Sequence, residues 1–274
     1  MKDELGTRIK EFYENRTRIK LRRKTYTILR LDGRSFSNYT RGLERPFDNG
    51  LIEDMDETAC YLCKNIQGAK FGFVQSDEIS ILVTDFDKIG TDAWFDGNIQ
   101  KMVSISASMA ASKFNHLRMK RIIDNSVKVI DYLVHITPFT NDIMNMNLAN
   151  FDARVFTIPS KTEVANMMVW RQQDTVRNSI SSVAQSLYSH NELNCKTTNQ
   201  MQDLIHEKGI NWNDYPAKQK RGRFIEKQEI QLETSFESTE KCQHAYVRNK
   251  WVSIECPIFT QNMDFLYSRI PDIN

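Results

Sequence analysis

Two aspartates of the sequence stand where they could hold metal ions. Asp32 follows the apolar, β-branched stretch 25–31, and Asp77 lies in a short acidic segment between two further apolar stretches. If these stretches are neighbouring strands, both carboxylates lie at one sheet edge and suit a pair of Mg²⁺ ions that also holds nucleotide phosphates. Gly33 has no Cβ, so metal and phosphate can approach its backbone. Alternatively, Asp32-Gly33 is only a turn dipeptide and Asp77 only a hairpin tip.

Two clusters of basic residues could contact the phosphates of a nucleic acid. The net charge of the chain is only +2, so local patches must bind such a partner. One cluster lies at 16–24 and the other at 218–223. Each cluster alone is equally open to interpretation as a solvated surface. The residues that we expect to contact RNA are Arg18, Lys20, Arg22, Arg23, Lys218, Lys220 and Arg221.

The composition excludes several classes of protein. Hydrophobic residues make up 40% and charged residues 26%, which is typical of globular proteins and excludes a disordered chain. Because the sequence has neither an apolar run of about 18 residues nor a secretory signal, we expect no membrane partner and a cytoplasmic location. The odd count of five cysteines fits a reducing compartment. Cys60 and Cys63 form a C-x-x-C without a second close pair, which argues against zinc.

The aspartates must be positioned by a small antiparallel sheet. The pattern predicts, in order, a strand, a helix, two strands joined by an acidic turn, a second helix and a further strand. This is the split β-α-β pattern of ferredoxin-like domains, with helices on one face of the sheet, so the expected fold class is α+β. The expected elements are strands at 25–31, 71–75, 79–83 and 127–136 and helices at 51–66, capped by Asp48, and at 99–117.

The last third of the chain is less regular and forms a mixed C-terminal extension. Apolar spacing predicts a helix over 170–188 and a shorter one over 200–208, and residues 224–254 favour strands and loops. The polar segment 170–174 either faces solvent or binds triphosphate or RNA backbone. We place a boundary near residue 140, with 141–274 as the C-terminal part of the same unit.

A competing interpretation concerns Lys70-Phe71-Gly72-Phe73-Val74. This segment nearly matches the RNA-recognition signature whose aromatic residues stack on bases. However, the glycine after the lysine is missing, and Ser76 stands where the final aromatic residue belongs. We therefore expect Phe71 and Phe73 to lie in the core or on a sheet face.

Four segments together resemble one known family, the tRNA-His guanylyltransferases and their relatives. The segments, in order, are Leu31–Phe36, Gln75–Glu78, Phe151–Val155 with Pro159-Ser160, and Trp170–Asp174. The similarity extends over about residues 7 to 225. Each motif alone is weak, but the four in this order are specific.

The resemblance implies a polymerase-like palm over 1–140 that adds nucleotides in the 3′-to-5′ direction to the 5′ end of a tRNA. It implies that Asp32 and Asp77 are catalytic and, with Gly33, hold two Mg²⁺ ions. ATP and GTP or other NTPs are the implied substrates, and a homotetramer is the implied assembly. The implied nucleotide-binding positions are Asp32, Gly33, Arg34, Ser35, Phe36, Ser37, Arg45, Ser76, Asp77, Lys101 and Asn178.

Two departures from the family pattern narrow the expected substrate. Members that add a guanylate to tRNA-His carry H-I-N-N after the W-R-Q motif, where this chain has Val176-Arg177-Asn178-Ser179. Ser37 replaces the histidine of the D-G-R-x-F-H motif. These changes resemble the branch that rebuilds truncated tRNA 5′ ends by copying the opposite strand of the acceptor stem. We therefore expect template-dependent repair after activation of the 5′ phosphate with ATP.

Two other functions remain open at this level. A non-catalytic RNA-binding module would use the basic clusters and residues 70–74, and it would need no metal. A palm-type nucleotide cyclase would use Asp32 and Asp77 on a free triphosphate and would release a cyclic product without RNA. The cyclase leaves residues 151–160 and 170–174 without a role.

Overall fold

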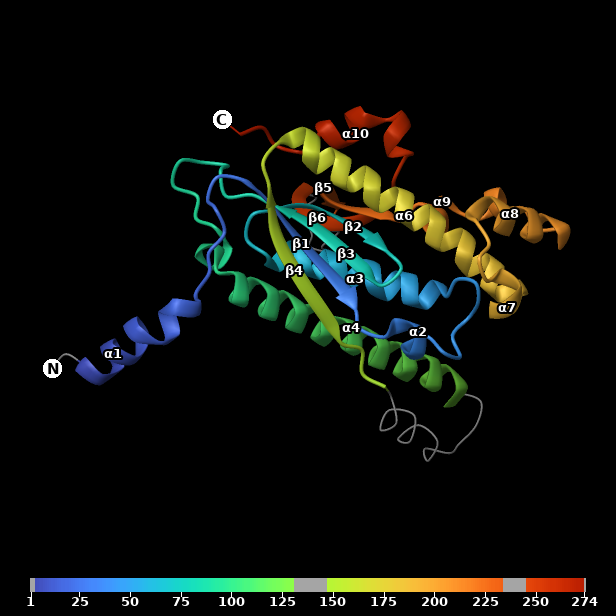
Figure 1. Cartoon of the computed structure of the whole chain (residues 1–274), viewed down its shortest axis with the longest axis horizontal. Helices are drawn as coiled ribbons and strands as arrows, with labels where there is room; N and C mark the ends of the chain where they lie inside the picture. Colours follow the sequence, from blue (N-terminus) through green and yellow to red (C-terminus); the bar gives the residue numbers. More distant parts are fainter. Residues whose placement is uncertain (1–2, 131–146, 234–244, 274) are drawn as a thin grey trace, which may run out of the picture.

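The described part of the chain builds one six-stranded antiparallel sheet (Figure 1). The computed structural model describes residues 3–130, 147–233 and 245–273. The strand order is β4-β1-β3-β2-β5-β6, so strands from both halves of the chain share the sheet. The predicted α+β class and the three strands near the aspartates are confirmed. The strands are β1 (Tyr26–Gly33), β2 (Ala69–Gln75), β3 (Glu78–Val83), β4 (Phe151–Ile158), β5 (Arg223–Glu233) and β6 (Ala245–Glu255).

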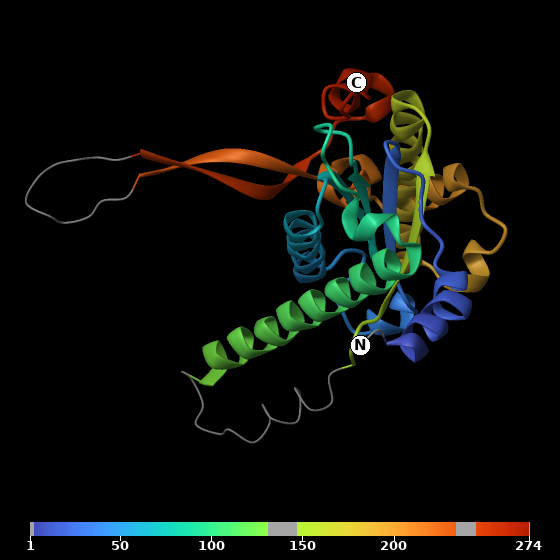
Figure 2. The ribbon, with the colours of Figure 1, turned by 90° about the vertical axis from the view of Figure 1, so that its left-hand side faces the viewer.

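Helices cover both faces of the sheet (Figures 1 and 2). The helices α3 (Asn49–Asn65) and α4 (Ile99–Ile130) pack on one face, and α6 (Lys161–Leu187) and α10 (Met263–Tyr267) pack on the other. The predicted pattern accounts for the first layer, and α6 and α10 add a second. The remaining helices are α1 (Glu4–Phe12), α2 (Phe36–Tyr39), α7 (His190–Leu193), α8 (Thr198–Glu207) and α9 (Ala217–Lys220), with 3-10 turns η1 (Glu14–Thr17), η2 (Trp94–Gly97), η3 (Trp212–Asp214) and η4 (Phe259–Gln261).

Alternating side chains of the strands supply the two cores. Leu29 and Leu31 of β1 pack with α3 and α4, whereas Ile28 packs with Phe71 and Phe73 on the side of α6. Phe71 is 1% and Phe73 0% exposed. These two rings are therefore core residues, as expected, and cannot stack on bases.

The helix α3 is anchored at its start and in its middle. Asp48 caps α3, as predicted, because its carboxylate accepts a hydrogen bond from the backbone N–H of Leu51 at 2.7 Å. Asp54 is 3% exposed and pairs with Arg118 and Arg121 of α4 at 3.0 and 2.8 Å. This clamp joins α3 to α4.

The strand predicted at 127–136 is wrong. The helix α4 continues to Ile130, so residues 127–130 are helical, and 131–136 lie outside the described residues. Each β-branched residue disfavours a helix by only a few tenths of a kcal/mol, and extending an existing helix needs no new nucleus. The helix predicted from residue 170 begins earlier, at Lys161. The boundary near residue 140 also lies outside the described residues and stays a prediction.

Two features of the described residues bear on a membrane-spanning helix and on the C-x-x-C pair. No helix in the described ranges is long and apolar enough to cross a membrane. Cys60 and Cys63 lie on α3, where burial raises the pKa of Cys60 to about 12 and that of Cys63 well above its ordinary value. Across the residues described, no group of three or more His, Cys, Asp or Glu side chains could hold a metal. The C-x-x-C pair therefore belongs to the packing of α3.

Candidate active site

The two predicted aspartates lie together at one edge of the sheet. The strand β1 pairs with β3, and Asp32 is in register with Glu78. Ser76 and Asp77 form the turn between β2 and β3, with a φ of 45° at Ser76. The backbone N–H of Gly33 donates a hydrogen bond to the carbonyl oxygen of Asp77 at 3.2 Å. This bond ties the end of β1 to the turn, so both carboxylates lie at the same place.

Close packing explains the glycine after Asp32. A Cβ on Gly33 would lie 2.2 Å from the ring of Phe36. That ring is 6% exposed and contacts the rings of Phe114 and Phe151, so it cannot move away. A larger residue at this position would separate the end of β1 from the Asp77 turn.

The protein itself supplies little neutralising charge to the two carboxylates. Burial raises the pKa of Asp77, and the negative charge of Asp32 raises it further. Among the described residues no lysine or arginine pairs with Asp77, and Asp32 pairs only with Arg154, at 4.0 Å. Mg²⁺ typically takes one or two carboxylates and completes its shell with phosphates and water. Two close carboxylates at an open edge therefore fit a divalent cation that is shared with a phosphorylated substrate.

The desolvated charge of Asp77 leads to a prediction about stability. We expect Asp77→Asn to raise the Tm of the metal-free protein at neutral pH, because the amide removes a desolvated charge beside Asp32. The pKa of Asp77 is raised in the folded state, so the charged side chain destabilises the fold fully above that pKa. This destabilisation disappears as the pH falls to 3.8, the ordinary pKa of an aspartate. Thermal unfolding should show a Tm difference at neutral pH that vanishes in acid. A variant with an equal or lower Tm at neutral pH would contradict the electrostatics described.

The aspartates open into a cleft of about 800 Å³. The loop before α3 forms one wall, and α6 forms the other. Seven predicted site residues line the cleft: Asp32, Phe36, Ser37, Arg45, Ser76, Asp77 and Asn178. Gly33, Arg34 and Ser35 lie in the segment between Asp32 and Phe36 but do not line the cleft. Arg34 is exposed, and its backbone N–H donates to the carbonyl oxygen of Asn150 at 2.8 Å.

The single chain does not bring Lys101 to this cleft. Lys101 lies in the first turn of α4, where its backbone N–H donates to Asn98 and its Nζ lies 5.9 Å from the ring centroid of Phe95. Asn98 is bridged to Lys20, which precedes β1, whereas Asp32 lies near the other end of that strand. Lys101 is therefore at the opposite end of the sheet, and its contact with nucleotide stays a prediction.

A buried network that sequence reasoning missed holds the Ser76-Asp77 turn. Arg171 of α6 is 5% exposed and donates two hydrogen bonds to the carboxylate of Glu78, from Nε and Nη2, both at 2.8 Å. The hydroxyl of Thr175 donates to the side chain of Gln75. Because Gln75 and Glu78 flank the turn, α6 fixes the position of Asp77 from both sides.

The solvated interpretation of segment 170–174 is therefore wrong for Arg171 and Gln172, and binding of triphosphate or RNA by the segment stays a prediction. Arg171 is buried against Glu78, and Gln172 is 5% exposed and hydrogen-bonded to the backbone of residues 257 and 259. The spacing contained the signal, because Arg171 follows the buried Met168 by three residues and so lies on the same helix face. Trp170, Arg171 and Asp174 of the segment line the cleft.

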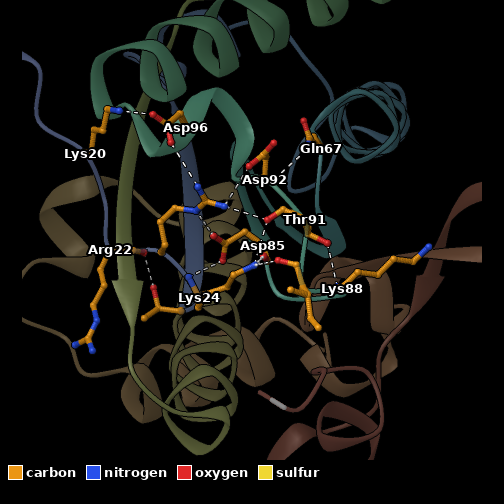
Figure 3. Close-up of polar contacts among 12 residues, drawn as sticks. Lys20, Arg22, Lys24, Gln67, Asp85, Lys88, Thr91, Asp92 and Asp96 are labelled. Carbon is orange, nitrogen blue, oxygen red and sulfur yellow. Dashed lines mark hydrogen bonds and ion pairs between the residues drawn. The ribbon is translucent and has the colours of Figure 1, made fainter.

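Three of the six cations of the basic cluster 16–24 form ion pairs within the protein. The pairs are Arg18 with Glu14, Lys20 with Asp96, and Arg23 with Asp85 at 2.6 Å. The ammonium of Lys24 donates to the backbone carbonyl oxygen of Asp85 at 2.7 Å (Figure 3). Arg22 points away from these contacts (Figure 3), and neither it nor Arg16 has an ion-pair partner within the described part of the chain. The cluster therefore fixes the segment before β1 to the segment after β3 and leaves two of its arginines free.

The second basic cluster is divided between interior and surface. Lys220 is 6% exposed, its ammonium donates to the carbonyl oxygen of Asn213, and burial lowers its pKa. Lys218 and Arg221 are partly exposed. Lys220 therefore has a packing role, and the other two remain accessible to a phosphate.

Comparisons with known proteins agree with the site. Residues 6–159, more than half of the chain, match the family model of tRNAHis guanylyltransferase. The chain is 38% identical to a bacterial tRNA(His) guanylyltransferase (Thg1)-like protein solved in complex with ATP, with a TM-score of 0.77 over 97% of this chain and 99% of that one. A protein of the same description in complex with GTP gives 38% identity and a TM-score of 0.72 over 98% and 99%. Uncharacterized protein R259 of Acanthamoeba polyphaga mimivirus is 32% identical over 239 residues, 84% of this chain and 79% of its own length.

The part of the chain that matches the family model carries the two aspartates of the cleft. The matched region contains Asp32, Gly33 and Asp77, and the structural likeness extends through α6, which holds the Asp77 turn. The sheet and its covering helices are those of palm-type members of the family. The chain therefore belongs to the tRNAHis guanylyltransferase family and is a tRNA-processing nucleotidyltransferase.

Proposed function

We propose that this enzyme is a template-dependent 3′-to-5′ nucleotidyltransferase that repairs the 5′ end of tRNA. The convergence of Asp32 and Asp77 in one cleft, with no protein cation beside Asp77, carries the proposal. Two carboxylates repel phosphates unless a cation lies between them. A protein that only binds RNA gains nothing from such a pair, whereas a phosphoryl-transfer enzyme needs one.

The chain offers three ligands for two Mg²⁺ ions. The carboxylates of Asp32 and Asp77 and the carbonyl oxygen of Gly33 would hold them. When bound, the ions would lower the pKa of the attacking hydroxyl and neutralise charge on the leaving group. The contribution of α6 is to keep Asp77 in place through Arg171 and Glu78.

The nucleotide would lie along the cleft with its phosphates toward the aspartates. Similar proteins solved with ATP and with GTP support an NTP in this position. Arg45 supplies positive charge for the triphosphate, while Ser37, Ser76 and Asn178 supply hydrogen-bonding groups. A tRNA 5′-monophosphate lacks a good leaving group, so ATP would activate it. The 3′-hydroxyl of an incoming NTP would then attack the activated phosphate.

The two departures from the family pattern favour repair over dedicated guanylate addition to tRNA-His. Ser37 and Asn178 both line the cleft, so the departures lie where the substrate is selected. Pairing with the opposite strand of the acceptor stem would then choose the nucleotide. The homotetramer and the cytoplasmic location remain predictions, and light scattering of the purified enzyme tests the former.

The test of this function is incubation with a tRNA that lacks its first 5′ nucleotide. With Mg²⁺, ATP and labelled NTPs, the enzyme should extend the RNA by the missing nucleotide, and EDTA should abolish the extension. A cyclic product formed without RNA would favour a cyclase. Binding of the tRNA without extension would favour an RNA-binding module.

The salt dependence of tRNA affinity separates the free from the paired cations. Each phosphate contact adds about 0.9 to the slope of log affinity against log salt for a duplex. We expect Arg22→Glu to flatten that slope by about one unit, whereas Lys20→Glu should act mainly through stability, because Lys20 is paired with Asp96. Binding titrations at several salt concentrations measure both variants. An unchanged slope for Arg22→Glu would identify the cluster 16–24 as a solvated surface.

A further inference from the structure

Trp170 is an exposed aromatic residue in a cleft whose other aromatic residues are covered. It lies on α6 and lines the cleft with 47% of its surface exposed. Of the described aromatic residues that line the cleft, Trp170 alone has more than a third of its surface exposed. Its neighbours Arg171 and Gln172 are both 5% exposed, so the helix turns the indole outward at a fixed position.

The indole is held by two cations that are tied to the catalytic strands. The guanidinium carbon of Arg171 lies 4.4 Å from the ring centroid, and that of Arg30 lies 5.8 Å away. Arg171 is bonded to Glu78, the residue after Asp77, and Arg30 precedes Asp32 by two residues on β1. Both guanidinium groups lie over the ring, Arg171 much closer than Arg30, and 47% of the Trp170 surface stays exposed.

A largely exposed arginine, Arg154, lies on the same face of the sheet and forms only long ion pairs, with Asp32 at 4.0 Å and with Asp152 at 3.8 Å. Arg154 of β4 is directly opposite Arg30, and cross-strand partners share a face. Its side chain is 55% exposed. An exposed aromatic ring next to an exposed arginine is the combination that binds single-stranded nucleic acid, through base stacking and phosphate contact.

The position of Trp170 argues for an RNA base and against the base of the NTP. The implied triphosphate contacts Ser37 and Arg45 lie in the segment that leads into α3, and α3 covers the opposite face of the sheet from α6. Asn178, which also lines the cleft, is on α6 but follows Trp170 by eight residues, about 12 Å along the helix. The RNA can therefore reach the aspartates from the side of Trp170 and Arg154.

We propose that Trp170 stacks on the unpaired acceptor-strand base opposite the missing nucleotide and orients this base for pairing, while Arg154 contacts the adjoining phosphate. The inference rests on the proposed repair function and names how the template is held. It makes Trp170 a positioning residue: a stacked template base presents its pairing edge to the incoming NTP.

The test uses the full-length enzyme and a tRNA that lacks its first 5′ nucleotide and carries 2-aminopurine opposite the gap. Stacking on an indole quenches 2-aminopurine, so wild-type enzyme should quench the fluorescence and Trp170→Ala should not. Trp170→Ala should also raise the KM for RNA about tenfold to a hundredfold, as expected for one lost base stack, with an unchanged Kd for ATP. Trp170→Phe should restore part of the quenching and part of the affinity for RNA.

A matched control is Tyr61→Ala, which removes a 37% exposed ring on α3 outside the cleft lining and should change neither readout. Quenching by Trp170→Ala equal to that of wild type would overturn the proposal. A weaker Kd for ATP with unchanged RNA binding would also overturn it and would assign the ring to the NTP base. The quenching measurement does not need catalysis. If the enzyme extends RNA but quenches equally with and without Trp170, the stacking proposal is wrong and the repair function stands. An enzyme that extends no RNA contradicts the repair function.

Discussion

Replacement of Asp77 by alanine is expected to abolish nucleotide addition while tRNA binding stays nearly intact. The carboxylate would hold the Mg²⁺ that stabilises the transition state by several kcal/mol, and each 1.4 kcal/mol is worth about a factor of ten. The rate constant for addition should therefore fall by about three orders of magnitude or more. Asp77 lies outside both basic clusters, so the affinity for RNA should be retained. Single-turnover extension and filter binding measure the two quantities.

Asp152 provides the matched control for this variant. It is an exposed aspartate on β4, directly opposite Asp32 in the sheet, and it does not line the cleft. Asp152→Ala should leave the rate of addition within a small factor of wild type. If Asp77→Ala still adds nucleotides in Mg²⁺, the assignment of Asp77 as a metal ligand is wrong.

Replacement of Arg171 by methionine is expected to destabilise the fold by about 3–5 kcal/mol. This arginine is the bidentate partner of Glu78 inside the protein, and its removal leaves the buried carboxylate with only the more distant Arg30, at 3.9 Å. The variant should also loosen the Asp77 turn, so addition should slow even in the fraction that remains folded. Denaturant unfolding followed by circular dichroism gives the change in the free energy of unfolding.

Arg177 offers a control on the same helix. Its guanidinium pairs with Asp174 at 2.9 Å, but its side chain is 50% exposed. Exposed pairs contribute at most about 1 kcal/mol, so Arg177→Met should have a small effect. Equal destabilisation by the two variants would show that the network of Arg171 and Glu78 does not hold the turn.

The convergence of Asp32 and Asp77 could be predicted because their placement depends on local order along the chain. Asp32 ends a strand, Asp77 occupies a two-residue turn, and the two strands pair, so short-range patterns were sufficient. The expected sheet, the cap at Asp48 and the core position of Phe71 followed in the same way. The helix over 127–130 was not predicted. The β-branched residues there favour a strand only weakly, and this preference is smaller than the gain from extending a helix that has already formed.

The interactions that were missed join residues far apart in sequence. Arg23 meets Asp85, and Arg171 meets Glu78, only after the sheet and α6 have assembled. A row of positive charges therefore looked like an RNA surface although three of its members are paired. Lys101 was placed by analogy with a family motif, and the chain alone puts it at the other end of the sheet. Single segments of sequence do not show which distant residues will pair.

The measurement that tests the proposed function most directly is a change of the template base. Four tRNAs lacking the first 5′ nucleotide, each with a different base opposite the gap, are incubated with Mg²⁺, ATP and each labelled NTP in turn. The account predicts that the added nucleotide follows the opposing base in all four cases and that Asp77→Ala adds none. Addition of the same nucleotide whatever the opposing base would contradict templated repair.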